Sequence, residues 1–153
     1  MSTTAKSASD VHGFEYDWLA RDVRGHVALF TTAGGGYAPD GFLTDTEAHA
    51  HAIELLLELP VFTDARFFPA VPSKRVNTWK LVAERGLYAY DSDPNGGPYK
   101  MVAAPVQPIT VAGLHATIVQ AINRVRFSFE FGDTSIVTQE MFELTAPCSV
   151  SES

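Results

Sequence analysis

The chain has few of the residues that stabilise or anchor a protein by special chemistry. Among its 153 residues there is one cysteine, Cys148, so no disulfide can form within the chain. No apolar run approaches the roughly 20 residues that a membrane-spanning helix needs. The first ten residues, MSTTAKSASD, lack the apolar segment of a secretory signal. We therefore expect a soluble, cytoplasmic protein with no membrane partner.

Charged residues are also few, at 19% of the chain, whereas hydrophobic residues make up 46%. These proportions are typical of a folded protein and unlike those of disordered chains. A chain of this length can bury a substantial core as one domain. We predict a single globular domain over residues 13–145, flanked by disordered tails at residues 1–12 and 146–153.

The net charge of −7 is distributed unevenly along the chain. Residues 1–60 contain nine acidic and three basic residues, which gives −6, whereas residues 61–100 contain four acidic and six basic residues, which gives +2. An acidic surface repels nucleic acid and attracts basic partners, although many proteins are acidic for solubility alone. We expect no nucleic-acid partner. A diluted basic cluster near Trp79 is interpreted as a solvated helix face: Arg66, Lys74, Arg75, Lys80 and Arg85.

Hydrophobic periodicity predicts an α+β fold that is built mainly from hairpins. Residues 14–32 alternate apolar and polar side chains around a turn at Gly25, which predicts a first hairpin. Residues 87–104 predict a second hairpin, with its turn at residues 93–97. Helical spacing predicts helices within residues 45–59, 77–86 and 112–125, and Thr44 with Glu47 forms a capping box for the first of them.

The cleanest alternation predicts a last strand over residues 125–133, with Phe127, Phe129 and Phe131 on one face. Prolines predict an irregular or edge element within residues 61–72, and residues 134–145 fit either a strand or a short helix. We interpret the aromatic residues of the strands as core. This order of elements predicts a mainly antiparallel sheet with two to three short helices packed on one face.

Three consecutive glycines, Gly34–Gly36, are the first candidate for functional chemistry. A P-loop needs a lysine and a serine or threonine after its glycines, and a dinucleotide-binding fingerprint opens a helix directly. Here Pro39 intervenes and the helical pattern begins only near Thr44. We therefore interpret the glycines as a connection between a strand and a helix.

Residues for metal binding and nucleophilic catalysis are equally sparse. His49 and His51 are two apart and point to opposite sides of the predicted helix, whereas a helical zinc pair needs a spacing of three or four. No Gly-x-Ser-x-Gly motif occurs, and the single cysteine lies in a predicted tail. We predict no catalytic residues, no metal and no cofactor. An enzyme whose carboxylates meet only in the folded chain stays open as an alternative.

One stretch of the chain carries a family resemblance. Its residues are Phe14, Trp18, Ala20, Asp22, Gly25, Val27, Ala28, Phe30, Thr32, Ala33, Gly34 and Gly36. This pattern, confined to residues 14–36, resembles the opening of a group of small bacterial proteins that look like immunity proteins of polymorphic toxin systems. The resemblance implies a non-catalytic inhibitor that binds a cognate protein toxin, as in toxin–antitoxin pairs. It carries over no functional residues.

We predict the toxin-binding surface in the acidic first third of the chain. Nuclease toxins carry basic clefts, and an acidic inhibitor would associate with such a cleft quickly. Asp40, Asp45 and Glu47 lie around the glycine loop and the first helix start, with Tyr37 as an aromatic anchor. Reversing the three charges together is expected to slow association. The alternative is a small-ligand binding or regulatory domain in which the glycine loop closes over a pocket.

Overall fold

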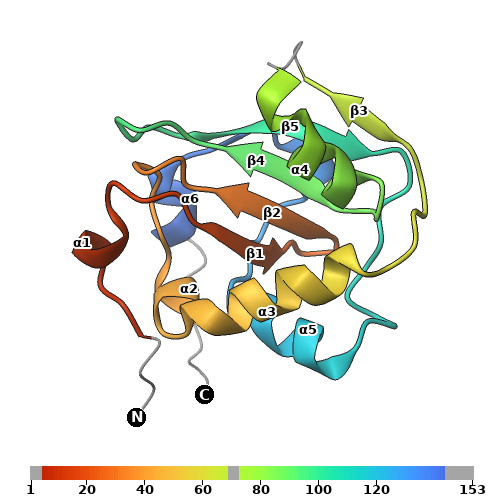
Figure 1. Cartoon of the computed structure of the whole chain (residues 1–153), viewed down its shortest axis with the longest axis horizontal. Helices are drawn as coiled ribbons and strands as arrows, with labels where there is room; N and C mark the ends of the chain where they lie inside the picture. The colour runs from red at the N-terminus through yellow and green to blue at the C-terminus, as the bar shows by residue number, and fades with distance from the viewer. Residues whose placement is uncertain (1–4, 69–72, 144–153) are drawn as a thin grey trace.

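A computed structural model describes residues 5–68 and 73–143 of the chain. A curved sheet of six strands forms its centre (Figure 1). The strands lie in the order β1 (Asp17–Arg21), β2 (Val27–Thr31), β4 (Tyr88–Asp91), β5 (Tyr99–Pro105) and β3 (Ala65–Phe67), and β6 (Ile136–Val137) pairs with β5. Strands β2 and β4 run parallel, and the other described pairings are antiparallel. The predicted α+β fold with a mainly antiparallel sheet is confirmed.

Six α-helices and one 3-10 turn accompany the sheet in the described part of the chain. They are α1 (Ala8–Val11), α2 (Asp40–Leu43), α3 (Thr46–Leu57), α4 (Ser73–Ala83), α5 (Ala116–Ile122), η1 (Phe131–Asp133) and α6 (Gln139–Glu143). Figure 1 shows α3, α4 and α5 on one side of the sheet, as the sequence predicts. A leucine-rich and alanine-rich core fills the space between these helices and the strands.

Both predicted hairpins are present. In the first, Trp18 lies opposite Phe30, and Gly25 takes a φ of 86° in the turn. The second joins β4 to β5 through a turn that contains Gly96 and Gly97, both with positive φ. Glycine adopts this backbone conformation without a steric cost, which explains why these turns carry it.

The start of α3 differs from the prediction by one residue. The carboxylate of Asp45, and not the Thr44 hydroxyl, accepts the N–H of Ala48 at 3.1 Å and caps the helix. Thr44 instead ends α2, and its N–H donates to the carbonyl of Asp40. The prediction of Thr44 as the cap is wrong because residues 40–43 form a helical turn of their own.

An aromatic cluster fills the face of the sheet opposite α3. The ring of Trp18 stacks on Phe30 with centroids 4.2 Å apart, and Phe30 stacks on Tyr90 at 4.7 Å. Three phenylalanines from the C-terminal part of the chain cover these rings: Phe127, Phe131 and Phe142. Because both faces of the sheet are covered, all five residues of β2 are buried, and not only every second one.

Residues 125–133, which were predicted as a strand, form no regular ladder. Arg126 makes a single bridge to Arg21 on β1, and the chain then enters η1. Residues 125–129 share backbone hydrogen bonds with Arg21 and Val23, and this pairing ends at Phe131, whose N–H donates to the buried carboxylate of Asp22 at 2.9 Å. The alternation of this segment is an alternation of burial, with Phe127 buried and Arg126 exposed.

Helix α1 lies within the predicted N-terminal tail, so the prediction of disorder is wrong for residues 8–11. Ser7 and Asp10 form a reciprocal capping box in which each side chain accepts a backbone N–H from the other residue. Val11 is buried against the aromatic cluster. The second predicted tail, residues 146–153 with Cys148, lies outside the described residues.

Residues 61–72 and 134–145, for which the sequence predicts no single secondary structure, contain short elements in their described parts. Residues 61–68 include the edge strand β3, in agreement with the proline pattern. Residues 134–143 contain both of the alternatives, first the strand β6 and then the helix α6.

Helix α3 is attached to the edge of β1 by a buried histidine. The Nδ1 atom of His49 accepts the N–H of Leu19 at 3.0 Å, and its Nε2 atom lies 3.3 Å from the carbonyl oxygen of Gly41. Since Leu19 uses Nδ1 as an acceptor, the ring is neutral with its proton on Nε2. Burial lowers the pKa of His49 from 6.5 to about 4.

His49 is therefore expected to make folding depend on pH. The unfolded chain binds a proton on His49 below pH 6.5 and the folded chain does so only near pH 4, so stability is lost as the pH falls through this interval. The two pKa values correspond to about 3 kcal/mol in the free energy of unfolding. His49→Asn should remove this part of the pH dependence, as measured by urea unfolding at neutral and mildly acidic pH.

His51→Asn is the matched control, because His51 lies exposed on the same helix. It should keep the pH dependence of the original protein. An equal pH dependence in the His49→Asn variant and the original protein would show that His49 is not the group responsible.

Candidate functional site

The four predicted binding residues do not form one surface. Tyr37 is half-buried: its ring lies 4.8 Å from that of Phe142, and its carbonyl accepts the hydroxyl of Tyr99. Asp45 caps α3 and lies 4.0 Å from Arg124. Tyr37 and Asp45 therefore make internal contacts that stabilise the fold. Asp40 and Glu47 are exposed, on α2 and on the first turn of α3.

Glu47 borders a groove between α3 and the segment that leads into β1. This groove has a volume of about 400 Å³. We call it the acidic groove, and it is lined by Lys6, Glu15, Tyr16, Asp17, Phe42, Thr46, Glu47, Ala50 and Ile53. Its apolar part includes Tyr16 and Phe42, whose rings meet edge to face at 5.9 Å. Three carboxylates and one lysine supply its charge.

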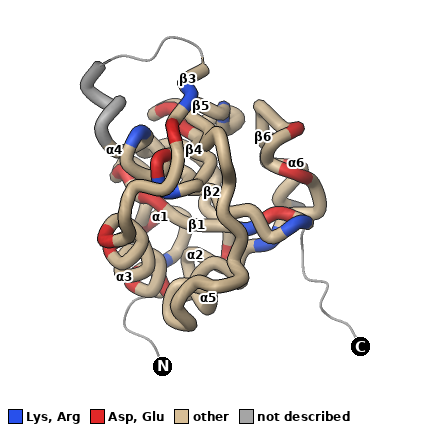
Figure 2. Tube along the Cα trace, turned by 90° about the vertical axis from the view of Figure 1, so that its right-hand side faces the viewer, with Lys and Arg blue, Asp and Glu red and all other residues tan. Residues whose placement is uncertain are grey.

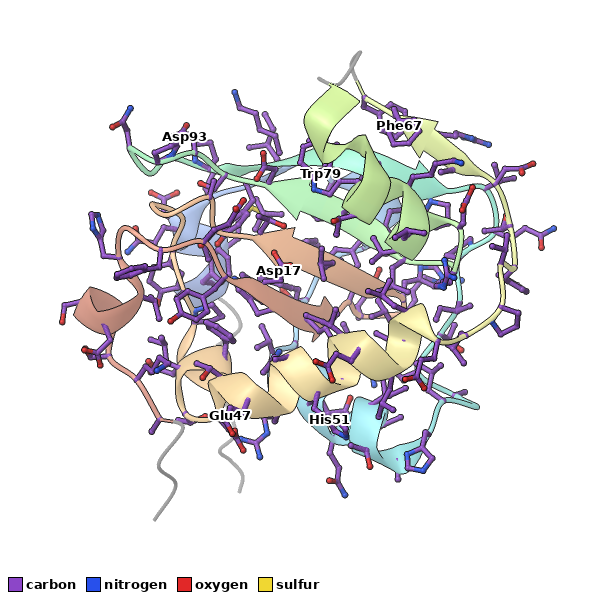
Figure 3. All side chains as sticks on the ribbon, in the orientation of Figure 1. Asp17, Glu47, His51, Phe67, Trp79 and Asp93 are labelled. Atoms are coloured by element: carbon purple, nitrogen blue, oxygen red, sulfur yellow. The ribbon has the colours of Figure 1, made fainter. Side chains whose placement is uncertain are left out.

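A second hollow extends the acidic groove toward α4. It has a volume of about 190 Å³ and is lined by Glu15, Asp17, Thr31, Thr78 and Trp79. Glu15 and Asp17 line both hollows, so the two hollows adjoin at the start of β1. Figure 3 shows Asp17 between Glu47 on α3 and Trp79 on α4. The hydroxyl of Thr31 donates to the Asp17 carboxylate at 2.8 Å, which orients the acid at this junction.

The electrostatic surroundings of the acidic groove are negative on the α3 side. Figure 2 shows acidic residues recurring along this helix, which carries Glu47 and Glu54 and is followed by Glu58. All three side chains are exposed. Charges that lie close together on one side of a protein add up to a field that reaches a partner before contact.

Glu15 and Asp17 line the groove but are not among the binding residues predicted from the sequence. The sequence nevertheless contains a weak signal for them. The alternation in residues 14–22 puts both on the polar face of the first strand. Their proximity to Glu47 depends on how α3 crosses β1, which no local pattern reports.

The glycine loop borders a further hollow, which has a volume of about 580 Å³. Helix α1, the β4–β5 turn and the start of α6 complete its wall. The N–H groups of Gly34, Gly35 and Gly36 all donate to Thr32, so they are already used within the loop. A Cβ atom on Gly35 would collide with the backbone of Asp93 and Pro94. The glycines thus allow two loops to approach closely, and the loop connects β2 to α2 as predicted.

The basic cluster near Trp79 has no exposed aromatic ring at its centre. Trp79 is buried in the core between α4 and the sheet. Lys80 lies 3.4 Å from Glu84, and Arg85 donates to the carbonyls of Leu59 and Leu81. The side chains of Lys74 and Arg75 lie outside the described residues. A buried tryptophan cannot stack on a nucleic-acid base.

Comparison with known proteins adds no relative, since no protein family, curated protein or solved structure matches the chain significantly. Among residues 5–68 and 73–143, no helix combines the length and the apolar character that crossing a bilayer requires. The same residues contain no group of three or more histidines, cysteines or acids placed to hold a metal ion.

The different roles of the predicted acids can be separated by alanine substitution. Asp45→Ala should lower the free energy of unfolding by about 1 kcal/mol because it removes the cap of α3. Asp40→Ala should change it by less than about 0.5 kcal/mol, since that side chain is exposed and makes no capping bond. Urea unfolding of both variants measures the difference, and equal values would contradict the capping role.

Proposed function

We propose that the protein is a non-catalytic immunity protein that neutralises a cognate toxin in the cytoplasm. The supporting observation is the acidic groove, in which three carboxylates surround an apolar floor. Two of these acids, Glu15 and Asp17, lie in the stretch that resembles immunity-type proteins. The groove offers a physical means of binding a basic partner through charge and an apolar floor.

The chemistry of the acidic groove suits a basic protein surface. Exposed carboxylates accelerate association by attracting positive charge over a distance. The apolar floor around Phe42 and Ile53 can then hold an aliphatic or aromatic side chain of the partner, as buried anchors do in tight complexes. The basic cleft of a nuclease toxin has the matching charge.

The proposed binding surface differs from the toxin-binding residues that the sequence predicts. Glu47 stays in the proposed surface, and Glu15 and Asp17 join it. Tyr37 and Asp45 are assigned to the fold because their contacts are internal. Asp40 does not line the groove.

A double charge reversal tests the acidic groove. Glu15→Lys with Glu47→Lys changes the net charge from −7 to −3, since each reversal adds +2. The test partner is any toxin-like domain encoded next to this gene; with such a domain, the variant should associate at least about tenfold more slowly at low salt. Stopped-flow or surface-binding kinetics measure the rate, and co-expression with the toxin measures loss of protection in cells.

Asp133→Lys with Glu140→Lys is the matched control, because it produces the same net charge from exposed acids on η1 and α6, which lie on the face of the sheet opposite α3 and outside the groove. Its association rate should stay within about threefold of the original. If both double variants slow association equally, total charge and not the acidic groove governs binding. If the neighbouring toxin is not bound at all, the proposed function fails.

A second candidate function is supported by the hollow beside the glycine loop. Its volume of about 580 Å³ would hold a small molecule. The described ionisable side chains that line it are His12, Tyr37 and Glu140, so it suits a ligand of little charge. This is the small-ligand alternative that the sequence leaves open.

A thermal-shift screen with a library of uncharged metabolites separates the two functions. The immunity proposal predicts no rise in Tm with these compounds and a rise with the toxin domain, because only ligands of the folded state stabilise it. A compound that raises Tm in the original protein but not in Ala8→Trp, which places a bulky ring in the wall of the hollow, would favour the ligand-binding function.

A further inference from the structure

Strand β3 ends the sheet on the side opposite β1. It pairs with β5 on one side, and no strand in the described part of the chain pairs with its other side. The carbonyl of Asp64 accepts the N–H of Val106, and the N–H of Phe68 donates to the carbonyl of Val102. Residues 64, 66 and 68 therefore direct their backbone groups toward β5. Ala65 and Phe67 direct theirs outward.

Large apolar side chains are exposed around this strand. Phe62 is 52% exposed, Phe68 is 40% exposed and Val106 is 45% exposed. Proteins usually protect a free strand edge with charge or with a covering segment, because an open edge can pair with another strand. Apolar side chains beside such an edge indicate a surface that is covered in a complex.

We propose that a second copy of this chain pairs with β3, edge to edge and antiparallel, about a two-fold axis at Ala65. In this register Ala65 lies opposite Ala65 of the partner subunit. Its outward N–H and carbonyl groups are then in the right phase to exchange hydrogen bonds across the axis. The same surface serves both copies, as a two-fold interface requires.

Charge complementarity selects this register. With the axis at Ala65, Asp64 lies opposite the partner's Arg66, and Arg66 lies opposite the partner's Asp64. Both side chains are exposed in the single chain. An axis at Asp64 or at Arg66 would place like charges opposite each other, which is destabilising. A strand that carries both charges, one residue on either side of the axis, is complementary to itself.

The apolar residues fit the same register. Phe62 and Phe68 lie before and after β3, so the exposed phenylalanines of both copies come near the ends of the paired strands. Cross-strand aromatic pairs stabilise antiparallel sheets. One register therefore matches the outward hydrogen-bonding groups of Ala65 and both charges, and it brings the exposed phenylalanines beside the interface. An arbitrary protein segment would match them only by coincidence.

This inference is independent of the proposed function. Strands β1 and β3 lie at opposite ends of the sheet (Figure 1), so pairing through β3 leaves the acidic groove of each copy uncovered. A complex of two copies would present two grooves.

Complementary charge reversal tests the pairing. The original protein should show a concentration-dependent dimer between micromolar and millimolar concentration by sedimentation equilibrium. Asp64→Arg alone and Arg66→Asp alone should each raise the dimer dissociation constant at least about tenfold, because like charges then meet twice. An equimolar mixture of the two variants should restore the dimer, since every arginine then faces an aspartate.

Glu54→Arg and Arg126→Asp are the matched controls, with the same changes in charge at exposed positions away from β3. They should dimerise like the original protein, and circular dichroism should show that all variants are folded. A monomer at all concentrations, single variants that dimerise normally, or a mixture that stays monomeric would each overturn the proposal.

Discussion

The hydrogen bond between Leu19 and His49 sets the position of α3 on the outer edge of β1. It satisfies an edge N–H that would otherwise face water or another chain, and it requires a neutral, buried ring. Glu47 precedes this histidine by two residues and Asp17 precedes Leu19 by two. The same bond therefore sets how far apart the two carboxylates of the acidic groove lie. Stability and the geometry of the candidate site thus depend on one contact.

The two edges of the sheet, β1 and β3, differ in what covers them. The edge of β1 is closed by His49 and by the segment that follows α5, where Arg21 exchanges backbone hydrogen bonds with Val125 and Phe127. The edge of β3 carries exposed apolar side chains and self-complementary charges. The groove proposed to bind a toxin, at the closed edge, and the contact proposed to bind a second copy, at the open edge, therefore lie at separate places on one small fold.

The buried carboxylate of Asp22 shows why the alternation of apolar and polar residues in residues 125–133 is not enough to predict a strand. It accepts the N–H groups of Arg24, His26 and Phe131, each at 2.9 Å, and so satisfies backbone groups that a ladder would otherwise pair. The phenylalanines between residues 127 and 131 are spaced to bury every second side chain, and the prediction of burial is confirmed. The prediction of a strand is wrong because burial and backbone pairing are separate requirements.

The sequence by itself determined the two hairpins, the helix-forming segments, the apolar character of the strands and the role of the glycines as a connection. These features depend on neighbours within a few residues, through turn glycines, periodicity and caps. Only the tertiary structure decided that His49 is buried, that Tyr37 packs inward and that Glu15, Asp17 and Glu47 share one groove. Those outcomes depend on contacts between segments far apart in the chain, such as Asp22 with Phe131, and no local pattern encodes the partner of a long-range contact.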